Sequence, residues 1–152
     1  MAANSMAISS RAEARSIPKG AVVLLGRFCF ALIFLVACAG HFSKHTIAYA
    51  ASQGVPLASL TVPLSGVIGL AGAVSILLGY RAKIGAWLIV VFLVPVTLML
   101  HNFWAVHDPM MAQMQMVMFM KNVGILGGAL LISQFGTGPL SLDARREPQK
   151  VT

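Results

Sequence analysis

Four long apolar segments separated by short polar ones dominate the pattern of this 152-residue chain. Each segment is close to the ~20 residues that a helix needs to cross a hydrocarbon layer of ~30 Å. The pattern therefore predicts an all-α fold, a polytopic membrane four-helix bundle. Its helices are expected at residues 20–40, 60–79, 84–104 and 109–135.

Polar residues and helix breakers predict the boundaries. The external segment 41–56 is typical of a short interfacial helix. Asp108 is suited to cap the last long helix, with Pro109 as its first residue, and Gly136 should end it. We divide the chain into an N-terminal tail (1–18), a helical domain (19–138) and a C-terminal tail (139–152).

The composition excludes a water-soluble domain. The chain is 58% hydrophobic and 10% charged, against about 25% charged residues in soluble domains. The net charge of +7 does not indicate a nucleic-acid partner, because the basic residues lie at helix ends rather than along one solvated face. The partner that the composition predicts is the lipid bilayer.

The distribution of charge predicts the orientation. If four helices alternate across the bilayer, nine of the eleven Lys and Arg residues fall on one side, and only Lys44 and Lys121 fall towards the other. The positive-inside rule then places both termini in the cytoplasm. All four histidines emerge on the outer side, at His41, His45, His101 and His107.

Three further features have structural interpretations. Ser65, Gly69 and Ala73 repeat at a spacing that lets membrane helices approach closely. Arg27 lies near the basic end of its helix, where an arginine usually extends its charge to the headgroups. The basic tail after Ser141 is expected in water.

His41 and His45 stand four residues apart. On one helical turn they would share a face, which is the spacing that two imidazoles need to bind one metal ion. No acid or thiol nearby completes such a site, so we prefer hydrogen bonding at the interface as their role.

Lys121 is the sharpest candidate for a functional group inside the membrane. It follows Pro109 by twelve residues, and a rise of ~1.5 Å per residue places its Cα roughly 18 Å beyond the helix start. A cation near mid-bilayer costs about 2.5–3.5 kcal/mol, and no acid lies within a span to pair with it. Its partner is then a helix carbonyl, Asn122, His101 or a ligand oxygen; the alternative is a lysine that reaches outwards to water.

Methionines offer a different chemistry. Six of them lie in residues 110–120, close to two histidines, and thioether and imidazole ligands suit Cu(I). Packing is the commoner use of methionine. A copper site would use His101, His107, Met110, Met114 and Met118. Hydrolytic triads and paired carboxylates are not formed, since Asp108 is the one acid on the outer side.

The chain resembles the DoxX family of small four-helix bacterial membrane proteins over about residues 24–140. The likeness rests, in order, on LGRFCFALIF, QGVP, SGVIGLAGAVSILLGYRAKIGA, HNFWAVHDP and FMKNVGILGGALL. The resemblance implies a multi-pass protein of the bacterial inner membrane that takes part in redox work with a membrane or periplasmic redox partner protein.

The leading hypothesis is a redox-associated subunit that binds a quinone or a similar small ligand near the outer face. As an enzyme it would be part of a quinone-linked membrane oxidoreductase, with His101 exchanging protons. The ligand would contact Lys121, Asn122, Asn102, Trp104 and Phe103. The first alternative is a non-catalytic scaffold or assembly subunit of a membrane complex, and the second is copper handling. No cofactor other than the quinone is indicated, and the oligomeric state is left open.

Overall fold

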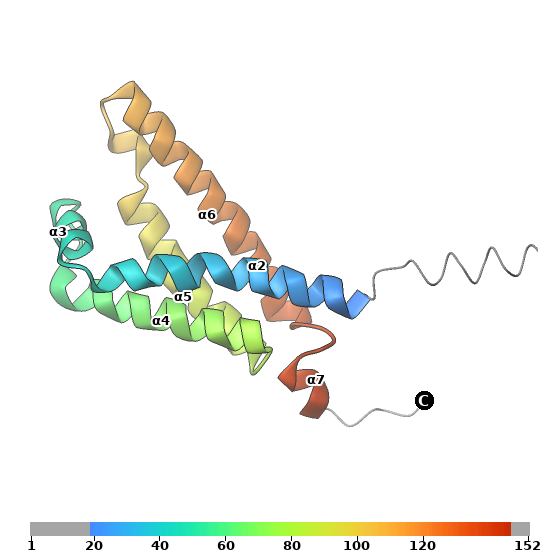
Figure 1. The fold of residues 1–152 in the computed structure, drawn as a ribbon. Coiled ribbons are helices and arrows are strands. Elements are labelled where there is room, and N and C mark those ends of the chain that lie inside the picture. Colours follow the sequence, from blue (N-terminus) through green and yellow to red (C-terminus); the bar gives the residue numbers. More distant parts are fainter. Residues whose placement is uncertain (1–18, 147–152) are drawn as a thin grey trace, which may run out of the picture.

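The computed structural model describes residues 19–146, and all regular structure in this range is helical (Figure 1). Four helices in it are long and apolar enough to cross a membrane. They are α2 (Lys19–Ala39), α4 (Ala58–Leu78), α5 (Ala82–Leu100) and α6 (Pro109–Phe135). The shorter elements are η1 (Gly40–Phe42), α3 (Lys44–Ser52), η2 (Phe103–Ala105) and α7 (Leu142–Arg146). The predicted all-α polytopic fold is confirmed, and the tail at 1–18 lies outside the described residues.

Small residues bring α4 close to both α2 and α5. A methyl group placed on Gly69 of α4 would lie 2.6 Å from Sγ of Cys38 in α2 and 3.2 Å from the ring of Phe92 in α5. A larger side chain would push these helices apart, so the predicted packing role of the small residues is confirmed. The surrounding buried core draws on all four long helices and includes Ala31, Phe34, Ala73, Ile76, Ala86, Ile89, Leu93 and Ala129.

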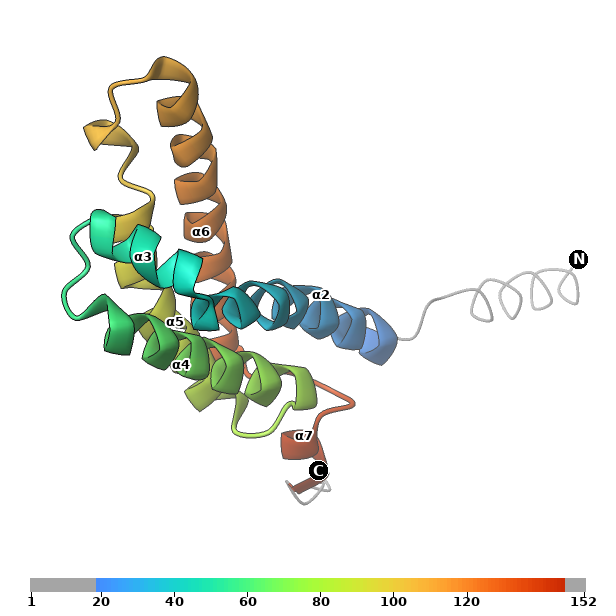
Figure 2. The same cartoon turned by 60° about the vertical axis from the view of Figure 1, so that its left-hand side comes forward.

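Helix α6 packs along α5 but diverges from α2 and α4 towards its own N-terminus (Figures 1 and 2). Its start is as predicted, because Pro109 is the first residue and Oδ1 of Asp108 accepts a hydrogen bond from the N–H of Met111 at 2.8 Å. Met114 and Val117 are among its many exposed apolar side chains. Much of α6 therefore faces away from the core formed by the other helices.

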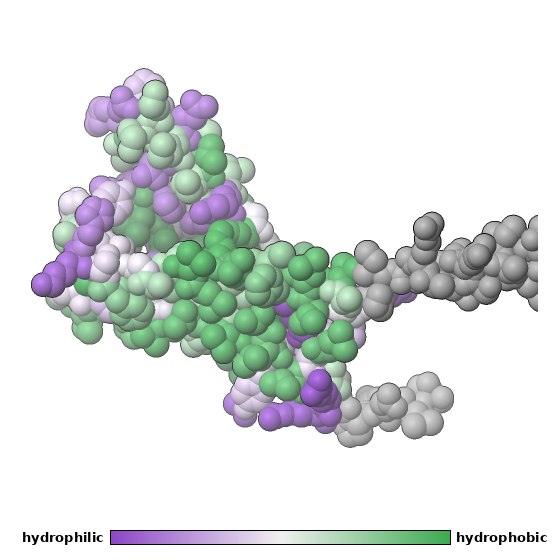
Figure 3. All heavy atoms as spheres, viewed as in Figure 1, coloured by the Kyte–Doolittle hydropathy of each residue, from purple (hydrophilic) through white to green (hydrophobic). Residues whose placement is uncertain are grey.

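The surface divides into an apolar middle and two polar ends (Figure 3). Hydrophobic side chains cover α2 and α4, whereas polar ones gather near α3, at the N-terminal tip of α6 and beside α7. We call residues 40–57 and 101–109 the histidine end, because they contain all four histidines. Residues 79–83 and 136–146 are called the basic end. This division is what a bilayer around the middle requires.

Helix α5 ends four residues earlier than the predicted Trp104. His101 leaves the helical conformation, with φ −123° and ψ 38°. The chain turns here because the rings of Phe103 and Trp104 pack on Phe119 of α6. If α5 continued as a helix, it would carry these two rings away from Phe119. All other predicted ends of the four long helices lie within two residues of the observed ones.

The predicted interfacial helix is present as α3. Ser43 before it is extended, and its hydroxyl caps α3 by accepting a hydrogen bond from the N–H of Thr46 at 3.1 Å. This break separates His41 in η1 from His45 in α3. The two histidines therefore do not occupy successive turns of one helix, and the spacing argument for a paired metal site does not apply.

The segment 136–146 folds back against the start of α5. Ser141 is buried, and the carboxylate of Asp143 accepts hydrogen bonds from two backbone N–H groups at the start of α5, one of them that of Arg81 at 2.8 Å. Arg27 is buried too, with Nη2 donating to the carbonyl of Leu140 at 2.7 Å. The expectation for Arg27 is thus wrong, because the segment 136–146 covers this side chain and its charge is buried. Arg145 and Arg146 are exposed, as expected for the basic tail.

Candidate functional site

His101, predicted to exchange protons, belongs to a short chain of hydrogen bonds at the histidine end. Its Nδ1 lies 2.8 Å from Oε1 of Gln115 in α6, and Nε2 of Gln115 lies 3.5 Å from the hydroxyl of Tyr49 in α3. An amide oxygen only accepts, so in this amide orientation Nδ1 of His101 carries the hydrogen. Sequence reasoning missed Gln115 and Tyr49, although Gln115 is a polar residue inside the methionine-rich run.

Asn122 is buried between α5 and α6. Its Nδ2 donates to Oγ1 of Thr97 at 3.1 Å, and the Thr97 hydroxyl donates to the carbonyl of Leu93 at 2.6 Å. The amide is thereby used to join two helices in the apolar interior. This arrangement explains a polar residue in a membrane span without a ligand.

Lys121 is exposed, although the next residue is buried, because consecutive residues of a helix differ in direction by about 100°. Its Nζ lies 3.6 Å from Sδ of Met118 on the preceding turn. The three polar side chains expected to form one site thus make their contacts separately: Lys121 with Met118, Asn122 with Thr97, and His101 with Gln115.

Phe103 and Trp104, expected to wall an entrance, form an aromatic cluster with Phe119. The ring centroids are 5.1 Å apart for Phe103 and Trp104, 5.5 Å for Phe103 and Phe119, and 5.8 Å for Trp104 and Phe119, each pair edge to face. Asn102 begins this turn, and its carbonyl accepts a hydrogen bond from the N–H of Ala105 at 2.9 Å. The cluster holds the loop after α5 against α6.

The residues of the copper alternative lie on α6 and on the loop before it, within residues 101–118. No group of three or more His, Cys, Asp and Glu side chains in residues 19–146 is placed to hold a metal ion. Among the proposed ligands, Met110 and His107 are exposed. The amine of Lys121 lies beside the sulfur of Met118, and this positive charge opposes the binding of a cation there.

A pocket of about 230 Å³ lies at the histidine end, between α3, α4 and α5. Its walls are mostly apolar, as in sites for small organic molecules, and include Val55, Val62, Val96 and Leu100. The polar side chains that line it are His41, Thr46, Thr61 and Ser65. None of the ligand residues predicted from the sequence is among its lining residues.

Two of the hydroxyl groups in this pocket donate to nearby backbone carbonyls. Oγ1 of Thr61 lies 3.0 Å from the carbonyl of Pro56, and Oγ of Ser65 lies 2.7 Å from the carbonyl of Val62. Each hydroxyl hydrogen is therefore occupied, whereas the oxygen lone pairs remain. Thr61 and Ser65 can accept a hydrogen bond from a ligand but have no second hydrogen to donate.

The hydroxyl of Thr46 shares a hydrogen bond with that of Ser43, in which either oxygen can be the donor. His41 is the one imidazole that lines the pocket. Its Nδ1 lies 3.1 Å from the carbonyl of Ala37, which accepts the Nδ1 hydrogen, and the ring packs 5.4 Å from that of Phe92. Nε2 makes no hydrogen bond within residues 19–146. A methyl group on Gly66 would lie 2.8 Å from Cβ of His41, so the glycine makes room for the imidazole.

The comparisons with known proteins agree with a membrane location. The family model that matches, over residues 4–148, is that of the SURF4 family. The chain is similar to inner membrane protein YphA of Escherichia coli K12, with 30% identity over 129 residues that cover 82% of this chain and 89% of YphA. Inner membrane protein YqjF of the same organism is 28% identical over 123 residues, which cover 80% of this chain and 88% of YqjF. No solved structure matches.

These matches correct the resemblance stated above. The assignment to the DoxX family is wrong, because the matching family model is that of SURF4 and neither relative carries a DoxX name. The expected location is confirmed: with four helices able to span a membrane, this is a multi-pass inner-membrane protein. The names of the family and of the two relatives state no ligand.

Proposed function

Because the chain belongs to the SURF4 family and is a multi-pass inner-membrane protein, we propose that it binds a quinone or a similar small redox ligand at its histidine end. The observation that carries this proposal is the apolar pocket in which Nδ1 of His41 is hydrogen-bonded and Nε2 has no partner among residues 19–146. The proposed site therefore lies around His41 and not, as the sequence predicted, around Lys121.

The size and polarity of the pocket favour a single ring with oxygen substituents. An apolar cavity of about 150 Å³ is enough for benzene, so about 230 Å³ suits one substituted ring. Apolar walls such as Val62 and Val96 would contact the ring faces. An attached hydrocarbon tail would extend into the surrounding lipid.

His41 supplies the hydrogen bond that a quinone and its reduced form both need. With the Nδ1 hydrogen directed at Ala37, the neutral imidazole presents Nε2 as an acceptor for a quinol hydroxyl. Once protonated, the same Nε2 donates to a quinone carbonyl. The hydroxyl oxygens of Thr61 and Ser65 also line the pocket and can accept a hydrogen bond from a quinol hydroxyl. Such binding would make the protein a redox-associated subunit that acts with a membrane or periplasmic redox partner protein.

The test measures binding of ubiquinone-1 to the full chain in lipid nanodiscs by equilibrium dialysis. Loss of one hydrogen bond of about 1.4 kcal/mol corresponds to a tenfold change in Kd, so His41→Ala should weaken binding about tenfold. His45→Ala is the matched control, because His45 is an exposed histidine of the same end. Val62→Phe, which fills the pocket, should abolish binding.

Two results would contradict the proposal. One is a wild-type protein that does not bind ubiquinone-1, and the other is equal binding by wild type, His41→Ala and Val62→Phe. If His101→Ala weakens binding while His41→Ala does not, the ligand lies between α5 and α6 and the site around His41 is rejected.

The scaffold alternative has one observation in its favour. Methyl groups placed on Gly124 and Gly127 of α6 would meet nothing within 4 Å, so this small-residue surface is open to a helix of another protein. Gly124→Leu should leave the fold intact and release such a partner on native electrophoresis of solubilised membranes. Gly69→Leu cannot serve this purpose, because its side chain would collide with Cys38 of the same chain.

A further inference from the structure

Among residues 19–146, the basic end contains a buried cation without a charged partner. Arg27 is 4% exposed, and its one hydrogen bond runs from Nη2 to the neutral carbonyl of Leu140 at 2.7 Å. Nε and Nη1 have no hydrogen-bond partner among the described residues. A guanidinium stays protonated in a protein, and a buried charge is costly unless an opposite charge compensates it. The described part of the chain thus leaves the positive charge of Arg27 uncompensated.

A second buried polar group lies beside this cation. Thr137 is 6% exposed, and its Oγ1 also has no partner among the described residues. A methyl group placed on Gly79 would contact both Nη1 of Arg27 and Oγ1 of Thr137, the latter at 2.9 Å. The two unsatisfied groups are therefore near neighbours on either side of Gly79.

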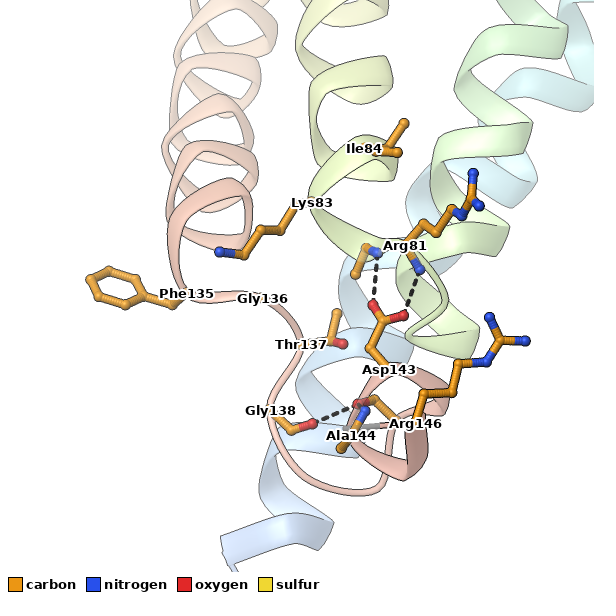
Figure 4. Close-up of a pocket in the computed structure, with 12 residues that line it drawn as sticks. Arg81, Lys83, Ile84, Phe135, Gly136, Thr137, Gly138, Asp143, Ala144 and Arg146 are labelled. Carbon is orange, nitrogen blue, oxygen red and sulfur yellow. Dashed lines mark hydrogen bonds between the residues drawn. The ribbon is translucent and has the colours of Figure 1, made fainter. Parts of the chain in front are cut away.

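Thr137 also lines a hollow of about 650 Å³ between the start of α5 and the segment 135–146 (Figure 4). Lys83 and Phe135 stand on one side of this hollow, and Asp143 stands on the other. Its ionisable lining residues are three cations and one acid, namely Arg81, Lys83, Arg146 and Asp143.

The one acid of the hollow is already neutralised in part by the backbone. The oxygens of Asp143 accept hydrogen bonds from the N–H groups of Arg81 at 2.8 Å and Ala82 at 3.1 Å, at the positive end of α5. The side chains of Lys83 and Arg146 are exposed. Nη1 of Arg27 and Oγ1 of Thr137 both lie beside Gly79, so the buried charge of Arg27 adds to the positive charge of the lining residues.

We propose that this hollow at the basic end binds an anionic phosphate group. Lys83 would contact the phosphate oxygens at the rim. Arg146, whose guanidinium lies 4.6 Å from the ring centroid of Tyr80, would add positive charge beside them, as would the buried charge of Arg27 next to Thr137. A phosphate suits the site because several donors can share its three or four oxygens. Such a group is offered both by the headgroup of an anionic lipid and by a soluble phosphate ester.

The experiment uses the full chain in neutral detergent and measures thermal stability and Kd during titration with dioctanoyl phosphatidylglycerol. Dioctanoyl phosphatidylcholine, which has no net charge, is the control ligand. We expect the anionic lipid to raise Tm and the zwitterionic one to leave it unchanged. Arg27→Gln should weaken binding about tenfold and Lys83→Gln severalfold. Lys44→Gln removes the same charge at the histidine end and should have no effect.

Glycerol phosphate as a competitor identifies the source of the phosphate. Competition supports a soluble phosphate ester, whereas binding of the lipid without competition supports a headgroup. Lys83→Gln and Arg146→Gln each replace an exposed side chain, so both variants should fold. They provide the test if Arg27→Gln does not fold. The proposal is overturned if neither anionic ligand binds, if phosphatidylcholine binds equally, or if Lys44→Gln weakens binding as much as Lys83→Gln.

Discussion

Gly72 of α4 and Gly85 of α5 are in backbone contact where the two helices meet: a methyl group on Gly72 would lie 2.8 Å from the carbonyl oxygen of Gly85, and one on Gly85 would lie 3.0 Å from that of Gly72. The opposing atoms belong to the backbone, so no flexible side chain can move aside. Gly72→Ala should therefore destabilise the protein by about 1–3 kcal/mol, the usual cost of overpacking. Reversible unfolding in mixed micelles measures this change.

The matched control for that substitution is Gly26→Ala in α2. A methyl group there meets nothing within 4 Å, and alanine is favoured over glycine inside a helix by roughly 0.5–1 kcal/mol. The two variants should shift stability in opposite directions. Equal destabilisation by both would show that the contact between Gly72 and Gly85 does not limit the approach of α4 and α5.

Gly79→Ala combines two costs at the basic end. The backbone there has φ +64°, a conformation that costs alanine about 1–2 kcal/mol, and the new methyl group would collide with Arg27 and Ser141. Gly54→Ala carries the backbone cost alone, since φ is +81° and nothing lies within 4 Å. The Tm of Gly79→Ala should therefore fall further than that of Gly54→Ala. Equal decreases in Tm would mean that the segment over Arg27 moves to accommodate the methyl group without cost.

The fold could be predicted because the bilayer fixes both the length and the composition of each span. The helix ends followed from local signals, such as Asp108 before Pro109. The end of α5 did not, because it depends on packing of Phe103 against Phe119, a contact between separate elements. The docking of Asp143 on α5 is likewise a contact between residues distant in the sequence.

The candidate site was harder to predict for a related reason. Sequence periodicity predicts one broad helix face but does not say where the neighbouring helix crosses it. That face carries Met110, Met111, Met114, Met118, Lys121 and Asn122. In the structure α5 covers Asn122 and leaves Lys121 exposed. The pocket around His41 is built from α3, α4 and α5 together, so no single segment carries its pattern.

Thr97 and Asn122 should be energetically coupled across the α5–α6 interface. Thr97→Val removes the acceptor for the Asn122 amide while keeping the volume, and leaves a buried donor unpaired. A double-mutant cycle with Asn122→Ala should give a coupling energy of about 0.6 kcal/mol and at most about 1.7 kcal/mol, the range for hydrogen bonds between membrane helices. Ser133→Ala is the control partner for Thr97→Val, because Ser133 donates to Leu130 of its own helix. A zero coupling for Thr97 and Asn122 would contradict the bond.

Lys121→Met separates the site predicted from the sequence from the site proposed at His41. Lys121 is exposed and contacts the sulfur of Met118, so its replacement removes no hydrogen bond of the pocket. We therefore expect Lys121→Met to leave the Kd for ubiquinone-1 unchanged. Membrane insertion should be unchanged or favoured by up to about 2.5–3.5 kcal/mol, according to how deeply the amine lies. If Lys121→Met weakens ubiquinone-1 binding tenfold while His41→Ala has no effect, the ligand oxygen is held by the lysine, and the unused nitrogen of His41 has another role.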